Sequence, residues 1–207
     1  MIKTSLLFSV LALLLLKTIQ PADPEPAPLI FKLMTKESQL IWKGTNVLGQ
    51  GHNGTIQFTS GSLVLSKEDK TQTGTFNIDM TSITSTDQGL WKGRKGLDEH
   101  LKSTDFFSVA KFPNATMSIK KVVPGNKLSQ FNVTGDLTLK GISKPVNFAA
   151  VIIQTKGKIK ANAEFSINRT DWGIYYKSGW LFPLIKNDLI SDSIKVSLNL
   201  LFSKSQD

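Results

Sequence analysis

The chain has 207 residues, of which 40% are hydrophobic and 20% are charged, as in a folded protein of one large or two small domains. It has no cysteine, which excludes disulfides, thiolate metal sites and cysteine nucleophiles, and its two histidines leave little material for histidine-based catalysis. The formal net charge of +9 suits anionic lipid or nucleic acid, but only Arg94 and Arg169 are arginines and the lysines are scattered. We therefore expect a solvated basic surface and no nucleic-acid partner.

The N-terminus has the pattern of an export signal. Lys3 precedes an eleven-residue apolar run, Leu6 to Leu16, which is too short to span a bilayer. An uncleaved membrane tether or an ordinary buried helix are the alternatives. We predict a signal peptide over residues 1–20 and a proline-rich linker over 21–37, because the segment PADPEPAP can neither pack nor form helix.

Alternation of apolar and polar residues dominates the rest of the chain and predicts strands. It is clearest over residues 75–80, 131–140, 158–167 and 194–202, and weaker over 38–43, 54–59, 62–67, 115–123 and 145–153. Turn-forming residues separate these segments at 51–54, 60–61, 67–74, 124–126 and 156–157. The sequence therefore predicts an all-β domain of eight or nine antiparallel strands.

So many short strands must close into a barrel or stack as a sandwich to protect their edges. Alternation alone does not say whether the apolar face points inward or outward. A barrel of the outer membrane would carry aromatic girdles at both strand ends, whereas Phe76, Phe131, Phe148 and Phe165 lie in mid-strand. We expect the apolar face to point inward.

Two stretches interrupt the strand pattern. Residues 87–110 place Leu97 and Leu101 at helical spacing, which predicts one or two short helices over one end of the sheet. Residues 169–191 mix aromatic residues with glycine and proline, which is typical of a long connection that serves as a binding loop or lid.

The polar candidates are few. Neighbouring helix residues point in different directions, so the sequence Asp98-Glu99-His100 does not predict a metal site, and we interpret His100 as structural. His52 lies in a glycine-rich turn and is either a turn residue or a head-group contact. Arg169 follows a strand and is either part of a buried ion pair or a contact for an anionic ligand. We expect no metal, no cofactor and no catalytic residues.

Four segments resemble the YceI-like family. His100 to Pro113 (HLKSTDFFSVAKFP) is similar to its signature, with Ser108 where an aspartate is usual. Gly74 to Ile83, Val133 to Val146 and Ile190 to Leu198 are similar to three further blocks in the expected order. The resemblance implies a lipocalin-like antiparallel β-barrel of about eight strands over residues 38–204, exported to the periplasm, with a polyisoprenoid or other long-chain amphiphile in its interior.

An eight-stranded barrel is either filled by side chains or just wide enough for one small ligand. Small residues at Ala161, Ala163 and Gly135 favour a hollow interior. The predicted apolar lining is Phe76, Ile78, Met80, Phe106, Phe107, Met117, Phe131, Val133, Phe148, Ala163, Phe165, Ile167 and Trp172, with His52 and Arg169 as head-group candidates.

We therefore expect a non-enzymatic lipid carrier whose partners are a long-chain lipid and, transiently, a membrane. The sequence is also compatible with a homodimer. The alternative is a filled barrel acting as a stress-related or protein-interaction module. The discriminating feature is the interior, because a carrier needs a continuous apolar cavity and a module does not.

Overall fold

The computed structural model describes residues 27–66, 72–87, 93–179 and 189–205. Its strands are β1 (Leu29–Leu33), β2 (Gln39–Thr45), β3 (Gly51–Leu65), β4 (Gln72–Ser85), β5 (Asn114–Pro124), β6 (Gln130–Leu139), β7 (Ile142–Thr155), β8 (Lys158–Asn168) and β9 (Ser193–Lys204). Helix α1 (Gly93–Lys102) and the 3₁₀ helix η1 (Arg169–Trp172) complete the fold. The predicted signal peptide of residues 1–20 lies outside the described residues.

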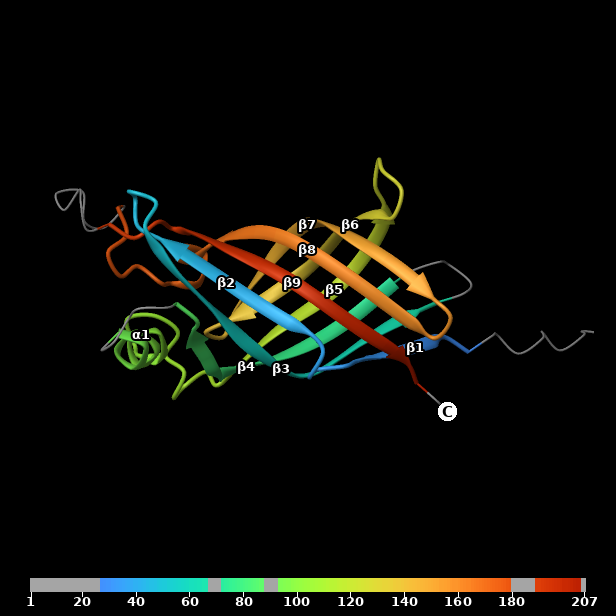
Figure 1. The fold of residues 1–207 in the computed structure, drawn as a ribbon, viewed down its shortest axis with the longest axis horizontal. Coiled ribbons are helices and arrows are strands. Elements are labelled where there is room, and N and C mark those ends of the chain that lie inside the picture. The colour runs from blue at the N-terminus through green and yellow to red at the C-terminus, as the bar shows by residue number, and fades with distance from the viewer. Residues whose placement is uncertain (1–26, 67–71, 88–92, 180–188, 206–207) are drawn as a thin grey trace, which may run out of the picture.

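The sheet closes on itself. Every pairing is antiparallel, and β3 and β4 pair with each other in addition to their other neighbours. Strands β1 and β2 both lie between β3 and β9, so they fill one position of the barrel in two pieces. The nine strands of the described residues therefore fill eight positions of a closed barrel, whose shape is seen in Figure 1. The expected all-β antiparallel barrel is confirmed.

The break between β1 and β2 is bridged by a side chain. The Ser38 hydroxyl accepts a hydrogen bond from the Leu201 N–H at 3.0 Å and lies 3.4 Å from the Leu201 carbonyl oxygen, to which it donates. The Met34 N–H donates to the same carbonyl oxygen at 2.8 Å. These contacts replace the ladder bonds that an unbroken strand would make.

The apolar face points inward, as expected. On β4, the side chains of Phe76, Ile78 and Met80 are buried, whereas that of Thr75, which points to the other face of the strand, is exposed. The same alternation holds along β5, β6 and β9, so each strand contributes one buried row to a single core. The wall of the barrel is thus one sheet thick, with an outer surface that is mostly polar.

Three predicted boundaries were wrong. Residues 29–33, assigned to the linker, form β1. The predicted turn at Ser60 and Gly61 is a bulge within one strand, β3, where the register shifts between Phe58 and Ser60. A side chain at Gly61 would lie 2.8 Å from the Phe76 ring, so this glycine permits close strand contact rather than a turn. The expected turn at 51–54 is the start of β3, and the chain reverses over residues 46–50 instead.

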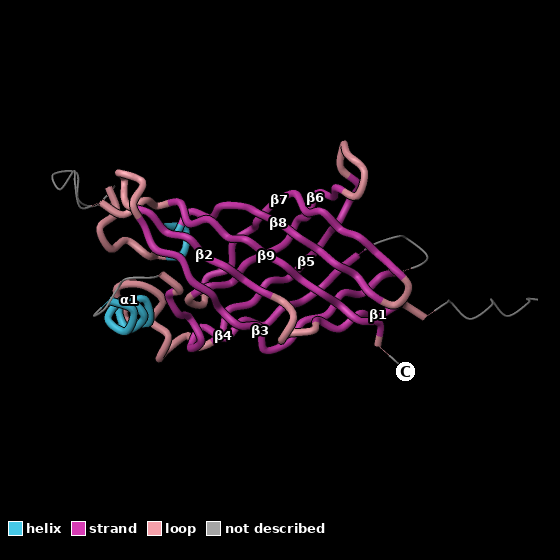
Figure 2. Tube along the Cα trace, in the orientation of Figure 1, coloured by secondary structure: helices cyan, strands magenta, loops and turns pink. Residues whose placement is uncertain are grey.

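Both helices lie at the same end of the barrel (Figure 2). Helix α1 packs on β4, where the Asp98 carboxylate accepts hydrogen bonds from the Thr84 hydroxyl and the Ser85 N–H, both at 2.7 Å. One α-helix therefore stands in the region where one or two were expected. Of the predicted long connection, residues 180–188 lie outside the described residues, and its first part packs inward through Trp172 and Ile174.

Candidate functional site: an apolar cavity in the barrel

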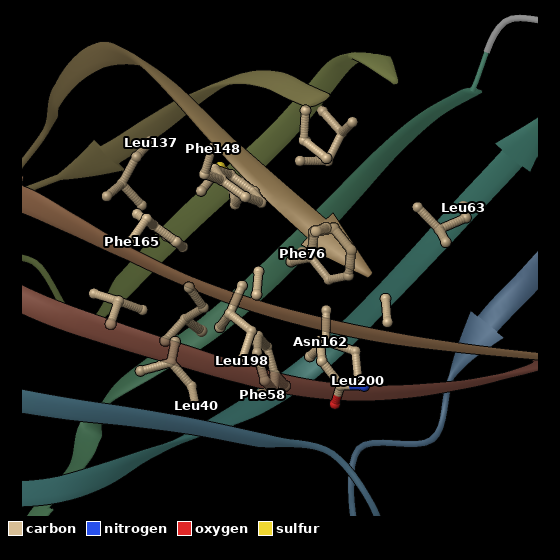
Figure 3. A pocket seen from close by; sticks show the side chains of 18 of the residues that line it. Leu40, Phe58, Leu63, Phe76, Leu137, Phe148, Asn162, Phe165, Leu198 and Leu200 are labelled. Carbon is tan, nitrogen blue, oxygen red and sulfur yellow. The ribbon is translucent and has the colours of Figure 1, made fainter. Parts of the chain in front are cut away.

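The barrel is hollow. The centre of a water molecule can move within a volume of about 190 Å³, far above the roughly 10–15 Å³ that one water needs on this measure. Strands β2 to β9 all contribute to its wall, and Figure 3 shows Phe76, Phe148 and Phe165 reaching into this space from three different strands. The polar residues of the wall are Gln72, Gln154 and Asn162, and none of the lining residues is charged.

Eleven of the thirteen predicted lining residues face this cavity: Phe76, Ile78, Met80, Phe107, Met117, Phe131, Val133, Phe148, Ala163, Phe165 and Ile167. The rings of Phe148 and Phe165 stack with their centroids 4.4 Å apart and their planes 12° from parallel. Such a flat pair presents a smooth apolar surface to a ligand chain.

Alanines make the room. Ala150 on β7 and Ala163 on β8 are cross-strand partners, and Ala161 lies on the same face of β8; all three line the cavity. Gly135, also expected to leave space, does not line it. A side chain there would lie 2.5 Å from the Ser118 carbonyl oxygen, so Gly135 serves the close approach of β5 at its bulge.

The helical end is plugged. Trp172 is 2% exposed, and its indole N–H donates to the Leu137 carbonyl oxygen at 3.2 Å. Phe106 packs 5.0 Å from the His100 ring, which also lies 4.6 Å from the Tyr176 ring, both edge-to-face. Trp172 and Phe106 therefore close the barrel and do not line the cavity, contrary to the prediction. His100 also pairs with Asp105 at 3.1 Å, in agreement with its structural interpretation.

At the opposite end the described residues leave the cavity open. Gln154 lines the cavity and is also exposed, so the cavity reaches the surface there. Its neighbours in the wall are Gln72, Leu65 and Val122, all partly exposed. These residues lie at the hairpins β3–β4, β5–β6 and β7–β8, which meet at this end. The cavity thus has an apolar interior and two amide side chains at its mouth.

One donor on the wall has no acceptor. Trp42 on β2 lines the cavity and is 8% exposed, and its Nε1–H has no hydrogen-bond partner among the described residues. A buried donor without a partner is costly and rare in native structures. The sequence analysis missed Trp42 together with Leu40, Leu198 and Leu200, although the alternation over 194–202 had marked two of them as inward.

Arg169 is a structural residue. Its guanidinium donates to the carbonyl oxygens of Ile174 at 2.9 Å, Ile190 at 3.0 Å and Ser191 at 3.0 Å, and pairs with the Asp192 carboxylate at 2.9 Å. Burial lowers the pKa of Arg169, and the Asp192 carboxylate acts in the opposite direction. Since the side chain is 2% exposed and lies outside the cavity wall, the structure favours the ion-pair alternative over ligand contact.

His52 lies on the outer surface rather than in the cavity. Its Nδ1 is 2.7 Å from Asp87, whose carboxylate also accepts the Asn53 N–H at 3.0 Å. Burial tends to raise the pKa of Asp87, but the hydrogen bonds from Asn53, His52 and Ser85 outweigh it, so the pKa lies below its usual value. The pair fixes the start of β3 to the end of β4.

In the described part of the chain, no three His, Asp or Glu side chains are placed to share a metal ion. Nor do the described residues include a helix with the length and apolarity to cross a bilayer.

A closed eight-position antiparallel barrel with an apolar cavity is the architecture of barrels whose interior is wide enough to hold one small ligand. A YceI-like domain model matches residues 31–202, and the chain belongs to that family. It is 40% identical to Protein YceI of Escherichia coli O157:H7 over 37% of this chain and 45% of that protein. A UPF0312 protein of Pseudomonas putida is 36% identical over 41% and 47%. The aligned part thus spans slightly less than half of each relative.

Solved structures share the fold. BcnA of Burkholderia cenocepacia superposes with a TM-score of 0.64 and 18% identity over 82% of this chain and 98% of its own. A polyisoprenoid binding domain from Saccharophagus degradans, implicated in plant cell wall breakdown, gives a TM-score of 0.62 and 16% identity over 84% and 98%. These similarities concern architecture.

Proposed function

We propose that this protein holds a polyisoprenoid or other long-chain amphiphile in the barrel cavity, as an exported periplasmic carrier or sequestering protein. The observation that carries the proposal is the apolar cavity with one open end. Its likeness in fold to a polyisoprenoid binding domain supports the choice of ligand class. The apolar run of residues 6–16 supports export.

The chemistry of the wall suits such a ligand. Burying one CH₂ group contributes about 0.8 kcal/mol, so a five-carbon isoprene unit contributes roughly 4 kcal/mol. Ordering a flexible chain and losing its free motion subtract from that sum, so several buried units are needed for tight binding. Since the described wall is long and without charge, tail length sets affinity more than head-group charge does.

The unpaired Trp42 N–H adds a requirement. An oxygen of the ligand placed near this indole would accept the hydrogen bond that the described residues do not supply. The glutamines at the mouth, Gln72 and Gln154, offer further amide contacts. We infer an uncharged, oxygen-bearing amphiphile rather than a pure hydrocarbon or an anion.

Native mass spectrometry with organic extraction, on the protein isolated from its own cells, tests the proposal. We expect a discrete extra mass that extracts as a long-chain isoprenoid or similar amphiphile. The variant Ala163→Trp places an indole in the cavity and should lose this mass, whereas Ser166→Trp, on the exposed face of the same strand, should keep it.

Thermal unfolding checks that both variants fold, since overpacking a core is itself destabilising. If Ala163→Trp does not fold, Ala150→Leu repeats the test with a smaller side chain at the partner position. A bare protein mass with no uptake of added quinone or polyprenol would refute the proposal and favour a stress-related or protein-interaction role without a carried lipid.

A further inference from the structure

Exposed apolar side chains gather around the open end. Leu128, in the turn of the β5–β6 hairpin, is 98% exposed, and Val151 and Ile153 on the outer face of β7 are 44% and 48% exposed. The Ile152 N–H donates to the Ser129 carbonyl oxygen at 2.9 Å, which holds this turn against β7. The three side chains therefore belong to one corner of the barrel, where the hairpin projects beyond its neighbours (Figure 1).

Four exposed lysines lie at this corner and on the adjoining surface of β8. Lys127 lies beside Leu128, Lys156 lies in the β7–β8 turn, and Lys158 and Lys160 lie on the outer face of β8. All four are exposed, and Lys160 is the cross-strand partner of Ile153. None of them is in an ion pair with another described residue.

The described charges at this end are all positive, and residues 67–71 (KEDKT), which connect β3 to β4, add two lysines, one glutamate and one aspartate and so no net charge. The described part of this end, residues 61–66, 72–76, 121–131, 150–160 and 202–205, contains no aspartate or glutamate. The described carboxylates lie elsewhere, for example Asp98 and Asp105 at the helical end and Glu37 in the break between β1 and β2. The described residues therefore give a net positive charge around the mouth.

We propose that this corner, formed by Leu128, Val151 and Ile153 with Lys127, Lys156, Lys158 and Lys160, docks on an anionic lipid bilayer. The lysines complement the phosphates of the head groups, and Leu128 inserts at the membrane surface. An exposed leucine at a hairpin tip, with a lysine next to it and further lysines on the neighbouring strand, has the character of an interfacial anchor.

The position of the cavity mouth favours a bilayer over an anionic protein as the partner. Docking at this corner brings the mouth, marked by Gln154, toward the membrane surface, so a water-insoluble chain passes between bilayer and barrel with little exposure to water. This part of the argument rests on the proposed lipid-binding function, whereas the docking surface itself rests on exposure and charge.

Vesicle co-sedimentation tests the inference, with vesicles of phosphatidylcholine alone and of equimolar phosphatidylcholine and phosphatidylglycerol. The triple variant K127E/K156E/K158E changes the open end. The matched triple variant K43E/K111E/K144E changes the net charge equally at exposed lysines nearer the helical end. Leu128→Asp is compared with Leu48→Asp, since Leu48 is also an exposed leucine in a turn, at 67% exposure.

We expect the unaltered protein to bind the anionic vesicles, to bind the neutral ones far less, and to dissociate as salt is added. Each lysine near an anionic surface changes affinity roughly fivefold, so losing three of them weakens binding about a hundredfold, and the three new carboxylates of the open-end triple variant should weaken it further. Leu128→Asp should weaken binding roughly tenfold. The control variants should retain most of the affinity.

Equal losses for the two triple variants, or no binding to anionic vesicles, would overturn the docking surface. Native mass spectrometry of the same samples separates this result from the proposed function. A protein that carries lipid but does not bind vesicles contradicts docking alone, and one that binds vesicles but never carries lipid contradicts the lipid-binding function alone.

Discussion

Replacement of Arg169 separates its structural role from ligand binding. The variant Arg169→Met keeps a long apolar stem but removes the guanidinium, leaving the carbonyl oxygens of Ile174, Ile190 and Ser191 without this donor. A hydrogen bond to a charged group contributes about 1.5–3 kcal/mol, and breaking a buried ion pair costs about 3–5 kcal/mol. Because the contacts share one side chain they do not add fully, and we expect a loss of about 4 kcal/mol.

That loss is a large part of the ordinary stability of a domain, about 5–15 kcal/mol. Urea unfolding measures it as a lower midpoint with an unchanged slope. The matched variant Arg169→Lys keeps the charge, but one ammonium group does not reproduce the planar fork, so an intermediate loss is expected. Native mass spectrometry on the folded fraction should show unchanged lipid content. Full stability combined with lost lipid would refute the structural role and restore the head-group hypothesis.

Three further substitutions test single features of the barrel. Ser38→Ala removes the acceptor of the Leu201 N–H in the broken strand, and should lower the free energy of unfolding by about 1–3 kcal/mol, measured by urea unfolding; no loss would contradict the bridging role. Asp87→Asn should destabilise the protein at neutral pH, and the difference from the unaltered protein should begin to shrink near pH 4 and disappear as the pH falls through the lowered pKa of the folded carboxyl, because a carboxylate whose pKa is lowered by folding stabilises fully only above its unfolded pKa. A difference that persists in acid would show that its charge is not responsible. Trp42→Phe should weaken binding of a polyprenol roughly fivefold or more while leaving binding of an isoprenoid hydrocarbon unchanged, in a competition titration; equal effects on both would exclude a hydrogen bond from this indole.

The sequence predicts the barrel wall well because alternation reports burial directly. Strand β8 follows residues 158–167 almost to the residue, and its inward row of Ala163, Phe165 and Ile167 faces the cavity. Local patterns do not report what closes the barrel. Trp172 and Phe106 are apolar like the lining residues, and only the path of the chain around the helical end makes them a plug.

Glycines show the same limit. Ser60-Gly61 has turn chemistry, yet it lies in a strand because Phe76 on β4 needs the space of the missing side chain. Likewise β1 has only five residues and follows prolines, so its pairing with β3 and β9 is visible only once both partners are in place. Three partners of Arg169 are carbonyl oxygens up to 22 residues away, and no residue pattern marks backbone atoms.

A hollow interior and a stable fold are compatible here because one end of the barrel supplies stabilising contacts and the other leads into the cavity. The helical end is bound tightly by the Arg169 contacts and by the buried Trp172, so the wall need not be held by a filled centre. The alanines at 150, 161 and 163 forgo the dispersion energy of larger side chains and leave room for a ligand instead. A ligand that binds only the folded barrel returns that energy, since a concentration a hundredfold above Kd adds about 2.7 kcal/mol. The stability of the fold and the proposed ligand binding are therefore coupled through the same small residues.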